Sequence, residues 1–264
     1  MSQAYREPRL TAGTPCQPIV VIPARLASVR LPDKPLADIH GEPMIVHVWR
    51  RAMEAAVGPV LVACGDAPIA DAVRKAGGDA VLTRPDHLSG SDRIFEALQT
   101  VDAAGRHDAV VNLQGDLPTV DPLAIRACLA PLDEPTVDIG TIATLVASEE
   151  ERRNPNMVKA AVAFPLTTPG RPPVGRALYF SRLPVPSGDG PHYHHVGIYA
   201  FRRDALARFI ALPPGALERR ERLEQLRALE AGMRIDVALV DSAPFGVDTP
   251  ADLARARAIL TPTK

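Results

Sequence analysis

The chain has 264 residues, of which 46% are hydrophobic and 23% are charged, and its formal net charge is −1. This composition is typical of a globular protein and argues against broad nucleic-acid binding, which needs a clearly basic surface. No apolar run is long enough to span a membrane, and the first 17 residues lack the apolar core of a secretory signal. We expect a disordered tail over residues 1–17 and one folded domain over residues 18–264.

Cysteine usage points to a reducing environment. Cys16, Cys64 and Cys128 are few and far apart in the chain. Their spacing fits neither a disulfide framework nor a zinc site. The cytoplasm is therefore the simplest location for this protein.

The first predicted element is a buried strand that ends in a basic loop. Residues 18–24 are apolar and rich in β-branched side chains, and the loop after them carries Arg25, Arg30 and Lys34. Ligands of open α/β sheets bind at the carboxyl ends of strands, so three cations there favour a polyphosphate site. The glycines of the Walker A and dinucleotide-binding loops are missing. A solvated basic loop without a ligand remains the alternative.

The first half of the chain alternates strand and helix patterns. One helix has a strong start signal, because Ser89 and Asp92 have the spacing of a capping box. Alternation of this kind predicts right-handed βαβ units and a mostly parallel sheet in an α/β fold. In chain order, the expected elements after the first strand are a helix over 44–56, strands over 60–63, 80–82 and 109–113, and a helix over about 91–104.

The region 137–203 has a different pattern, with extended segments separated by loops rich in proline and glycine. It predicts a mixed or antiparallel extension of the sheet, or a small lid. A terminal helix is expected after Thr249, because Thr249, Pro250 and Asp252 suit its first positions. The other expected elements are extended segments over 139–146, 157–164 and 196–201, helices over about 203–211 and 218–231, and a strand over 235–240.

Two aspartates are candidates for a metal site. Asp116 follows the predicted strand 109–113, so it should lie at a strand end facing the basic loop. A carboxylate there is well placed to hold Mg²⁺, which takes one or two carboxylates plus phosphate oxygens, although Gly-Asp is also ordinary turn chemistry. Asp248 precedes the terminal helix, where the helix dipole alone would favour it. It becomes a metal ligand only if it meets Asp116 at one ion.

For several other polar residues, an ordinary surface or core role remains open beside a functional one. His192, His194 and His195 lack a zinc spacing and are expected to be surface or core histidines, although His195 is also a candidate for binding an anionic substrate. The stretch 218–227 is expected to be mostly a solvated helix face with i,i+4 ion pairs. Arg182, at a predicted strand end, is either a solvated cation or an anion-binding residue.

Nine collinear motifs, taken together, give the chain a family resemblance. It resembles the 3-deoxy-D-manno-octulosonate (Kdo) cytidylyltransferases, also called CMP-Kdo synthetases, over residues 18 to 260. The first loop and the strand-end aspartate also resemble sugar nucleotidyltransferases in general, whereas the later motifs are particular to the Kdo branch. The motifs lie at 22–36, 41–48, 84–93, 111–116, 154–159, 177–182, 195–199, 223–227 and 246–250.

The resemblance implies a Rossmann-like nucleotidyltransferase domain and the reaction CTP + Kdo → CMP-Kdo + pyrophosphate. It implies Mg²⁺ on Asp116 and Asp248, with in-line attack of the sugar hydroxyl on the α-phosphorus. It also implies a cytoplasmic homodimer acting in lipopolysaccharide synthesis, with sugar-binding and dimer contacts in the region 137–203. By resemblance, the catalytic residues are Arg25, Lys34 and Asp116, and the nucleotide-binding residues are Ala24, Arg25, Arg30, Lys34, Ser89, Gly90 and Ser91. The residues that match the sugar pocket are Gln114, Tyr179, Ser181, Arg182, His195, Tyr199, Glu224 and Gln225.

The sequence departs from the family pattern at two places. Leu117 stands where the family commonly has Glu, and Cys64-Gly65 replaces a common Thr-Asp pair, with Asp66 one place on. These departures bear on base contacts and substrate choice more than on the class of reaction. Two alternatives therefore stay open: transfer to another acid sugar, such as 8-amino-Kdo or a sialic acid, and a non-catalytic nucleotide-binding regulator.

Overall fold

The structure is a computed structural model that describes residues 16–27, 30–165 and 173–261. Most of the expected tail, residues 1–15, lies outside the described residues. Within them, one sheet has nine strands, and its pairings run in the order β5-β4-β1-β6-β10-β7-β11-β9-β8. The strands are β1 (Pro18–Ala24), β4 (Val60–Cys64), β5 (Asp79–Leu82), β6 (Ala109–Asn112), β7 (Ile139–Leu145), β8 (Lys159–Ala163), β9 (Val174–Ser181), β10 (Tyr193–Arg202) and β11 (Ile235–Leu239).

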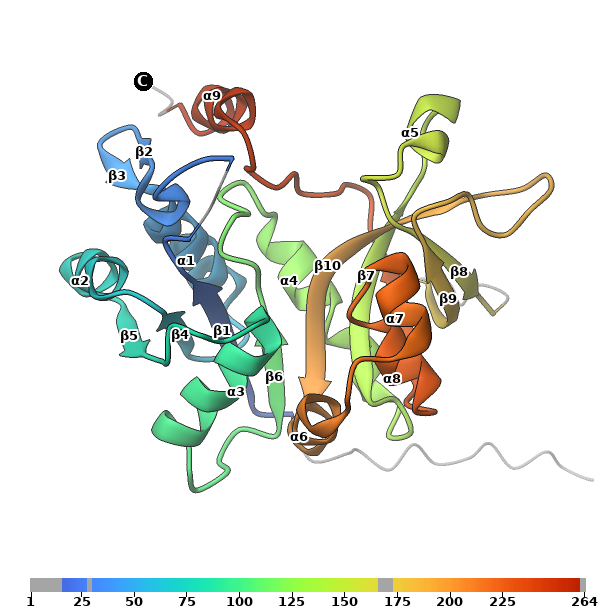
Figure 1. Cartoon of the computed structure of the whole chain (residues 1–264), viewed down its shortest axis with the longest axis horizontal. Coiled ribbons are helices and arrows are strands. Elements are labelled where there is room, and N and C mark those ends of the chain that lie inside the picture. Colours follow the sequence, from blue (N-terminus) through green and yellow to red (C-terminus); the bar gives the residue numbers. More distant parts are fainter. Residues whose placement is uncertain (1–15, 28–29, 166–172, 262–264) are drawn as a thin grey trace, which may run out of the picture.

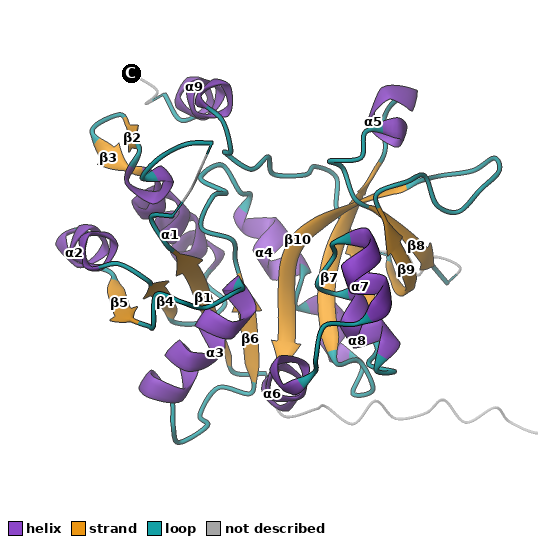
Figure 2. Ribbon diagram, in the orientation of Figure 1, coloured by secondary structure: helices purple, strands orange, loops and turns teal. Residues whose placement is uncertain are grey.

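Helices cover both faces of this sheet, as Figures 1 and 2 show. The small ribbon of β2 (Asp38–Ile39) and β3 (Glu42–Pro43) lies beside one helical layer and precedes the first α-helix directly. The helices are α1 (Met44–Ala55), α2 (Ala67–Lys75), α3 (Gly90–Val101), α4 (Pro122–Ala127), α5 (Glu149–Arg153), α6 (Arg203–Ala211), α7 (Ala216–Glu221), α8 (Leu226–Glu230) and α9 (Pro250–Ile259), with short 3₁₀ turns η1 (Lys34–Leu36) and η2 (Ala130–Asp133).

The sheet is parallel in its first half and mixed beyond it. β5, β4, β1 and β6 are parallel neighbours, as expected from the βαβ pattern. β10 then pairs antiparallel with both β6 and β7, and β9 pairs antiparallel with β11 and β8. The expected mixed or antiparallel extension from region 137–203 is confirmed. It contributes four of the nine strands, so the sheet as a whole is mixed and not mostly parallel. The start of β10 also pairs with β8, which joins the two ends of this extension.

Alternation of side chains along the central strands produces two cores. Val20 and Ile22 of β1 face a cluster that includes Ile45 of α1, whereas Ile19 and Val21 face the opposite cluster, which includes α3 and α6. This is the period-2 pattern of a strand that is buried on both faces. A third cluster packs α9 against β2 and the start of α1. It brings the end of the chain back to the loop that follows β1 (Figure 1).

Two expected helix starts are confirmed by their caps. The Ser89 hydroxyl accepts a hydrogen bond from the backbone N–H of Asp92, and the Asp92 carboxylate accepts in return from the N–H of Ser89. Thr249 and Asp252 form the same reciprocal arrangement at α9. Each cap satisfies backbone donors that a helix cannot pair by itself. The first of them fixes the wall of the cavity described below.

The helix expected over 218–231 was wrong, because the structure has two short helices there. α7 ends at Glu221, Arg222 adopts a left-handed backbone with φ of 57°, and α8 begins at Leu226. The expected solvated face was also wrong in part: Glu218 and Arg227 form an ion pair in which each side chain is only 13% exposed. This buried pair holds α7 against α8 across the break. The break places Glu224 and Gln225 outside regular helix.

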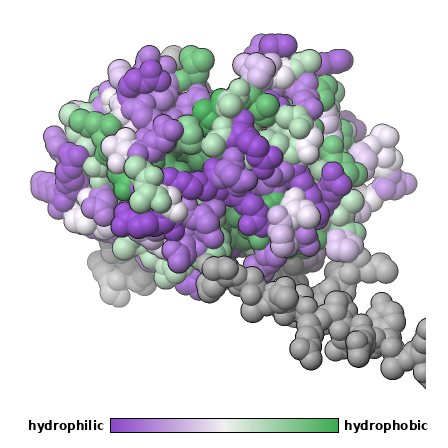
Figure 3. All heavy atoms as spheres, turned by 90° about the horizontal axis from the view of Figure 1, so that it is seen from below, coloured by the Kyte–Doolittle hydropathy of each residue, from purple (hydrophilic) through white to green (hydrophobic). Residues whose placement is uncertain are grey.

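Much of the surface is hydrophilic, as the face drawn in Figure 3 shows, with small hydrophobic areas between the polar residues. Among the described residues, no helix is long and apolar enough to cross a bilayer.

A buried carboxylate ties the end of α3 to the start of α6. Asp102, whose side chain is 1% exposed, accepts from the backbone N–H groups of Arg106 and His107 and from Arg203 Nη1 at 2.6 Å. Burial alone would raise the pKa of the Asp102 carboxyl, but these hydrogen bonds outweigh burial and hold that pKa well below its ordinary value of 3.8.

We expect Asp102→Asn to lower the free energy of unfolding by about 3 kcal/mol near neutral pH, because it leaves the Arg203 charge without its buried partner. Urea unfolding measures the difference. Since the folded-state pKa is lowered, the stabilisation is fully present above the ordinary pKa and fades as the pH falls through the folded value. The deficit of the variant should therefore be equal at neutral and mildly acidic pH and shrink only in strong acid.

Asp204→Asn is the matched control, because Asp204 is 76% exposed and lies 3.7 Å from Arg208. Solvent screens such a pair, so almost no change is expected. Equal losses from the two substitutions would contradict the role given to Asp102.

Candidate active site

A cavity of about 310 Å³ lies where the parallel strands end. β1 ends at Ala24 and β6 at Asn112, and the segments that follow both strands line the cavity together with the start of α3. This is the expected ligand position in an open α/β sheet. Seven of the residues expected at the site line it: Ala24, Arg25, Lys34, Ser89, Gly90, Gln114 and Asp116.

Lys34 joins the two candidate metal ligands. Its Nζ donates to Asp116 Oδ2 at 2.8 Å and to Asp248 Oδ1 at 3.0 Å. The backbone N–H of Val247 also donates to the carbonyl of Asp116 at 2.9 Å, so the two acidic segments are in direct contact. Arg30 binds the second oxygen of Asp248 at 2.9 Å from a largely exposed position. Aspartates 132 positions apart in the numbering thus converge on the Lys34 ammonium, whereas their expected role as ligands of one divalent ion stays a prediction.

The electrostatics of this cluster favour a charged lysine. Burial of the Lys34 side chain, which is 17% exposed, would lower its pKa. The Coulombic attraction and hydrogen bonds of Asp116 and Asp248 outweigh burial and raise the pKa of Lys34 above its ordinary value. The ammonium is therefore fully protonated at neutral pH.

The same donor set fits a divalent cation that is shared with phosphate. Asp116 and Asp248 supply carboxylate oxygens, the ligands that Mg²⁺ prefers, and Mg²⁺ commonly takes one or two carboxylates together with phosphate oxygens and water. Across the described ranges no group of three or more His, Cys, Asp or Glu side chains has the arrangement of an all-protein metal site. The residues present therefore suit a metal that arrives with a nucleotide better than one that the protein holds alone.

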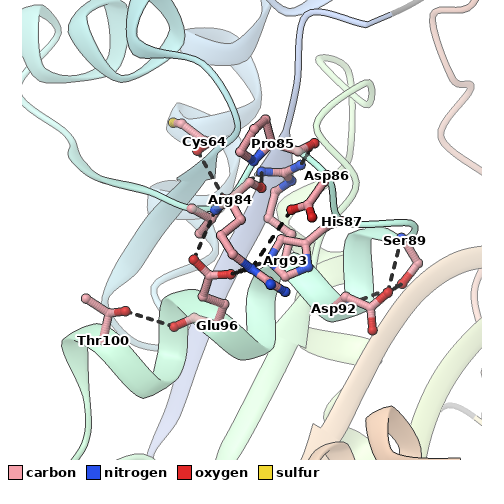
Figure 4. Close-up of polar contacts among 11 residues, drawn as sticks. Cys64, Arg84, Pro85, Asp86, His87, Ser89, Asp92, Arg93, Glu96 and Thr100 are labelled. Atoms are coloured by element: carbon pink, nitrogen blue, oxygen red, sulfur yellow. Dashed lines mark hydrogen bonds and ion pairs between the residues drawn. The ribbon is translucent and has the colours of Figure 1, made fainter.

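A buried arginine organises the loop between β5 and α3 (Figure 4). Arg93 is 2% exposed, and its guanidinium donates to Thr83 Oγ1 at 2.5 Å and to the carbonyl of Arg84 at 3.1 Å. Thr83 in turn donates to the carbonyl of Cys64. Next to this group, Glu96 contacts both His87 and Arg84. The loop is thereby fixed to β4 and α3 before it reaches the cavity.

This loop also supports the basic segment that follows β1. The carbonyl of His87 accepts a hydrogen bond from Arg25 Nη1 at 3.5 Å. On the other side, Asp66 Oδ2 accepts from the backbone N–H of Leu26 at 2.8 Å. His87 thus contacts the exposed Arg25 side chain at the cavity wall, and Asp66 holds the backbone of the next residue.

The two departures from the family pattern have structural explanations. Leu117 is 7% exposed and belongs to the hydrophobic core, and it does not line the cavity. At Gly65, an added Cβ would lie 2.9 Å from Arg93 Nη1, so glycine leaves room for the buried guanidinium. Neither Leu117 nor Gly65 lines the cavity. These two departures therefore give no structural reason to expect a different class of reaction.

Of the residues expected in the sugar pocket, Gln114 lines the cavity already described, and the other seven fall into two groups. In the first, three donors converge on Glu221: the Tyr179 hydroxyl at 3.3 Å, the Ser181 hydroxyl at 2.9 Å and the Arg182 backbone N–H at 3.1 Å. The Arg182 guanidinium also donates to the main-chain carbonyls of Pro155, Glu221 and Arg222. Arg182 therefore anchors the end of α7, and two of its five N–H groups remain for a ligand.

The second group lies on β10 and in the break between α7 and α8. Burial lowers the pKa of His195 to about 3, so the imidazole is neutral at pH 7 and its Nε2 contacts Thr141 Oγ1 at 3.0 Å. The His195 ring therefore carries no positive charge at pH 7, and its expected contact with an anionic substrate stays a prediction. Burial, then the charge of Glu224, raises the pKa of Tyr199. Gln225 is 6% exposed.

One bond connects the expected nucleotide and sugar regions. Ser91 Oγ donates to Glu224 Oε2 at 3.0 Å. Burial raises the pKa of Glu224, while hydrogen bonds from Ser89 and Ser91 and the charge of Arg227 oppose that shift. The other oxygen, Oε1, is buried without a hydrogen bond and lies 3.9 Å from Arg227 Nη2. The Ser91–Glu224 hydrogen bond thus links the residues expected to bind the nucleotide to those expected to bind the sugar.

Sequence reasoning missed four residues that shape the site. Asp66 and Arg93 hold the loops at the cavity. Glu221 accepts the hydrogen bonds of the first group of expected sugar residues. Asn112 contacts Ser91 and Gln114. An asparagine inside a buried apolar strand run was a usable signal, because such a side chain needs partners. Glu221 gave no local signal, since its partners lie about 40 positions away in the chain.

Comparison with known proteins identifies relatives that match most of the chain. A family model described as cytidylyltransferase matches residues 19–235. The 3-deoxy-manno-octulosonate cytidylyltransferase of Paramagnetospirillum magneticum is 65% identical over 243 residues, which cover 92% of this chain and 97% of the relative. The enzyme of the same name from Rhodospirillum rubrum is 62% identical over 256 residues, covering 97% and 99%.

A solved structure shares the fold closely. It is the CMP:2-keto-3-deoxy-manno-octonic acid synthetase complexed with CTP, with a TM-score of 0.83 and 40% identity over 92% of this chain and 98% of that one. The mixed α/β architecture of this chain is therefore that of a nucleotidyltransferase of the same type.

We expect Gly65→Val to lower the free energy of unfolding by about 2 kcal/mol, because the branched side chain must displace a guanidinium that carbonyl and hydroxyl oxygens hold in place. Urea unfolding measures the loss. Gly246→Val is the control, since an added Cβ at the exposed Gly246 meets nothing within 4 Å. A Gly65→Val variant as stable as the parent would show that the Arg93 guanidinium can adopt another conformation at no cost in stability.

Proposed function

This chain belongs to the 3-deoxy-manno-octulosonate cytidylyltransferase family, and we propose that it transfers the cytidylyl group of CTP to Kdo with release of pyrophosphate. The sugar hydroxyl forms a bond to the α-phosphorus, and the bond from that phosphorus to the bridging oxygen of pyrophosphate breaks. The hydroxyl proton passes to solvent or to the departing pyrophosphate.

One observation supports this proposal most directly. Asp116 and Asp248 meet on the Lys34 ammonium at the edge of a cavity that Arg25 also lines. Two carboxylates and two cations at the carboxyl ends of parallel strands suit a triphosphate that brings a divalent cation with it. A neutral ligand would not need four charged side chains at its binding site.

The basic side chains carry the phosphoryl-transfer part of the proposal. Little covalent chemistry is left to a protein in such a reaction, so positioning and charge neutralisation dominate. Arg25, held by His87, presents a planar fork that matches phosphate oxygens. Lys34 supplies a compact charge beside the carboxylates and neutralises the pyrophosphate as it leaves.

We propose that Asp116 and Asp248 hold Mg²⁺. When bound, this ion would stabilise the charge that develops on phosphate oxygens and lower the pKa of the attacking hydroxyl. Arg30 and Lys34, which contact the same carboxylates, keep these side chains oriented toward one point.

On the sugar side, we propose that the two groups described above line the acceptor site. The free N–H groups of Arg182 suit a sugar carboxylate, while the neutral His195, the Tyr199 hydroxyl, Glu224 and Gln225 suit sugar hydroxyls. We also place the nucleotide in the parallel, Rossmann-like half of the sheet. A cytoplasmic homodimer in lipopolysaccharide synthesis, with contacts from region 137–203, completes the proposal.

We expect rapid pyrophosphate release when the purified protein receives CTP, Kdo and Mg²⁺, and none when any one of them is omitted. A coupled phosphate assay measures it. Turnover with 8-amino-Kdo or a sialic acid but not with Kdo would replace the proposed acceptor. CTP binding by calorimetry without any turnover would favour a nucleotide-binding regulator.

Asp116→Asn tests the carboxylate cluster. We expect turnover with Mg²⁺ to fall by at least about 100-fold, because a group that stabilises transition-state charge is lost. The midpoint of thermal unfolding should change little, since Asp248 still pairs with Lys34. Asp71→Asn, at a surface aspartate that is 75% exposed, is the control and should retain full activity. Near-normal turnover of Asp116→Asn would remove Asp116 from the proposed metal site.

A further inference from the structure

We propose that Asn112 is a positioning residue, which fixes the side-chain amide of Gln114 so that its carbonyl oxygen faces the cavity as an acceptor for a hydrogen-bond donor of a bound substrate. The inference rests on the proposed function, because it assigns a selective contact to that same site. The substrate group it implies is an N–H or O–H, from either the nucleotide or the acid sugar.

Asn112 is an unusual residue for its place in the sheet. It is the last residue of β6, 1% exposed, and it lies between Val111 and Leu113, which are both fully buried. Asparagine is disfavoured in strands, and a buried amide must find partners. Its amide is bonded on both sides: Gln114 Nε2 lies 3.3 Å from its Oδ1, and its Nδ2 lies 3.5 Å from Ser91 Oγ.

These contacts belong to a chain that ends at a carboxylate. Ser91, which is 3% exposed, donates its hydroxyl proton to Glu224 Oε2 at 3.0 Å. Arg227 Nη2 lies 3.9 Å from the other oxygen of Glu224. The chain therefore runs from Gln114 through Asn112 and Ser91 to Glu224.

The bond at one end sets the direction of every bond in this chain. The Ser91 hydroxyl donates its only proton to Glu224 Oε2. With its one proton used, Ser91 Oγ is left to accept from the NH₂ group of Asn112. Asn112 then presents its oxygen to Gln114, and Gln114 must answer with its NH₂ group. A reversed amide at either position would set two donors or two acceptors against each other.

Gln114 is consequently left with its carbonyl oxygen for the ligand. Gln114 lines the cavity, and its Oε1 lies 3.9 Å from the position of an added Cβ on Gly90, which lines the same cavity. A site arranged to accept from a substrate N–H or O–H rejects an analogue that lacks this group, because the acceptor, covered by the bound analogue, is then unpaired. A freely turning glutamine would present its NH₂ group part of the time and lose this selectivity.

A double-mutant cycle tests whether Asn112 acts through Gln114. We expect Asn112→Leu, which keeps the volume and removes both bonds, to raise the KM of one substrate about 10-fold, equivalent to about 1.4 kcal/mol. In a Gln114→Ala background, the same substitution should change that KM less than about twofold, because residues that act as one unit are non-additive. The substrate whose KM rises, CTP or Kdo, carries the donor.

Two further measurements separate positioning from stability. Val110→Ala, at a buried residue of the same strand, should destabilise the protein while leaving both KM values unchanged. Asn112→Ser is the second variant should Asn112→Leu fail to fold, because serine is too short to span from Ser91 to Gln114. Equal effects of the Asn112 substitution with and without Gln114 would overturn the proposal.

Failure of this inference can be told from failure of the proposed function. Absence of pyrophosphate release by the unmodified protein would overturn the proposed reaction. In that case the affinities of the same four proteins for CTP and for Kdo, measured by calorimetry, complete the cycle without turnover. No coupling between positions 112 and 114 in either ligand's affinity would overturn the role of Asn112.

Discussion

The ammonium of Lys34, held between Asp116 and Asp248, is the contact on which the site depends. Lys34 lies in the loop after β1. It contacts Asp116, which follows β6 and is 82 positions away in the chain, and Asp248, which precedes α9 and is 214 positions away. The packing of α9 against β2 and α1 brings Asp248 into reach. Without that packing Asp248 would be an ordinary acidic residue before a helix, and the carboxylate pair would not exist.

Several buried polar groups elsewhere follow the same logic, because a partner offsets their loss of water. Arg93 is held by a hydroxyl and by carbonyl oxygens, and Glu218 is paired with Arg227. These contacts contribute little net stability compared with apolar packing, but they fix geometry, since an unpaired partner would be costly. The loops that line the cavity are therefore supported from behind by the residues least exposed to solvent.

Several features were predictable because their signals are local. The alternation of strands and helices, the capping boxes at Ser89 and Thr249, and the placement of Arg25 and Asp116 at strand ends are all confirmed. The antiparallel extension over 137–203 was predicted, but the position of β10 beside β6 and the break after Glu221 were not. Strand order depends on where a long connection returns, and the break depends on a buried ion pair between two short helices, so neither is encoded in the spacing of apolar residues.

By itself the sequence determined the chemical groups at the site and the strand ends that carry them, because hydrophobic periodicity and capping act over a few residues. Only the tertiary structure decided which of these groups meet. It placed Lys34 between two distant carboxylates, made His195 neutral by burying it, and gave Asn112 a donor on one side and an acceptor on the other. Burial and contacts between distant segments set protonation and hydrogen-bond direction, and both arise only when the chain is folded.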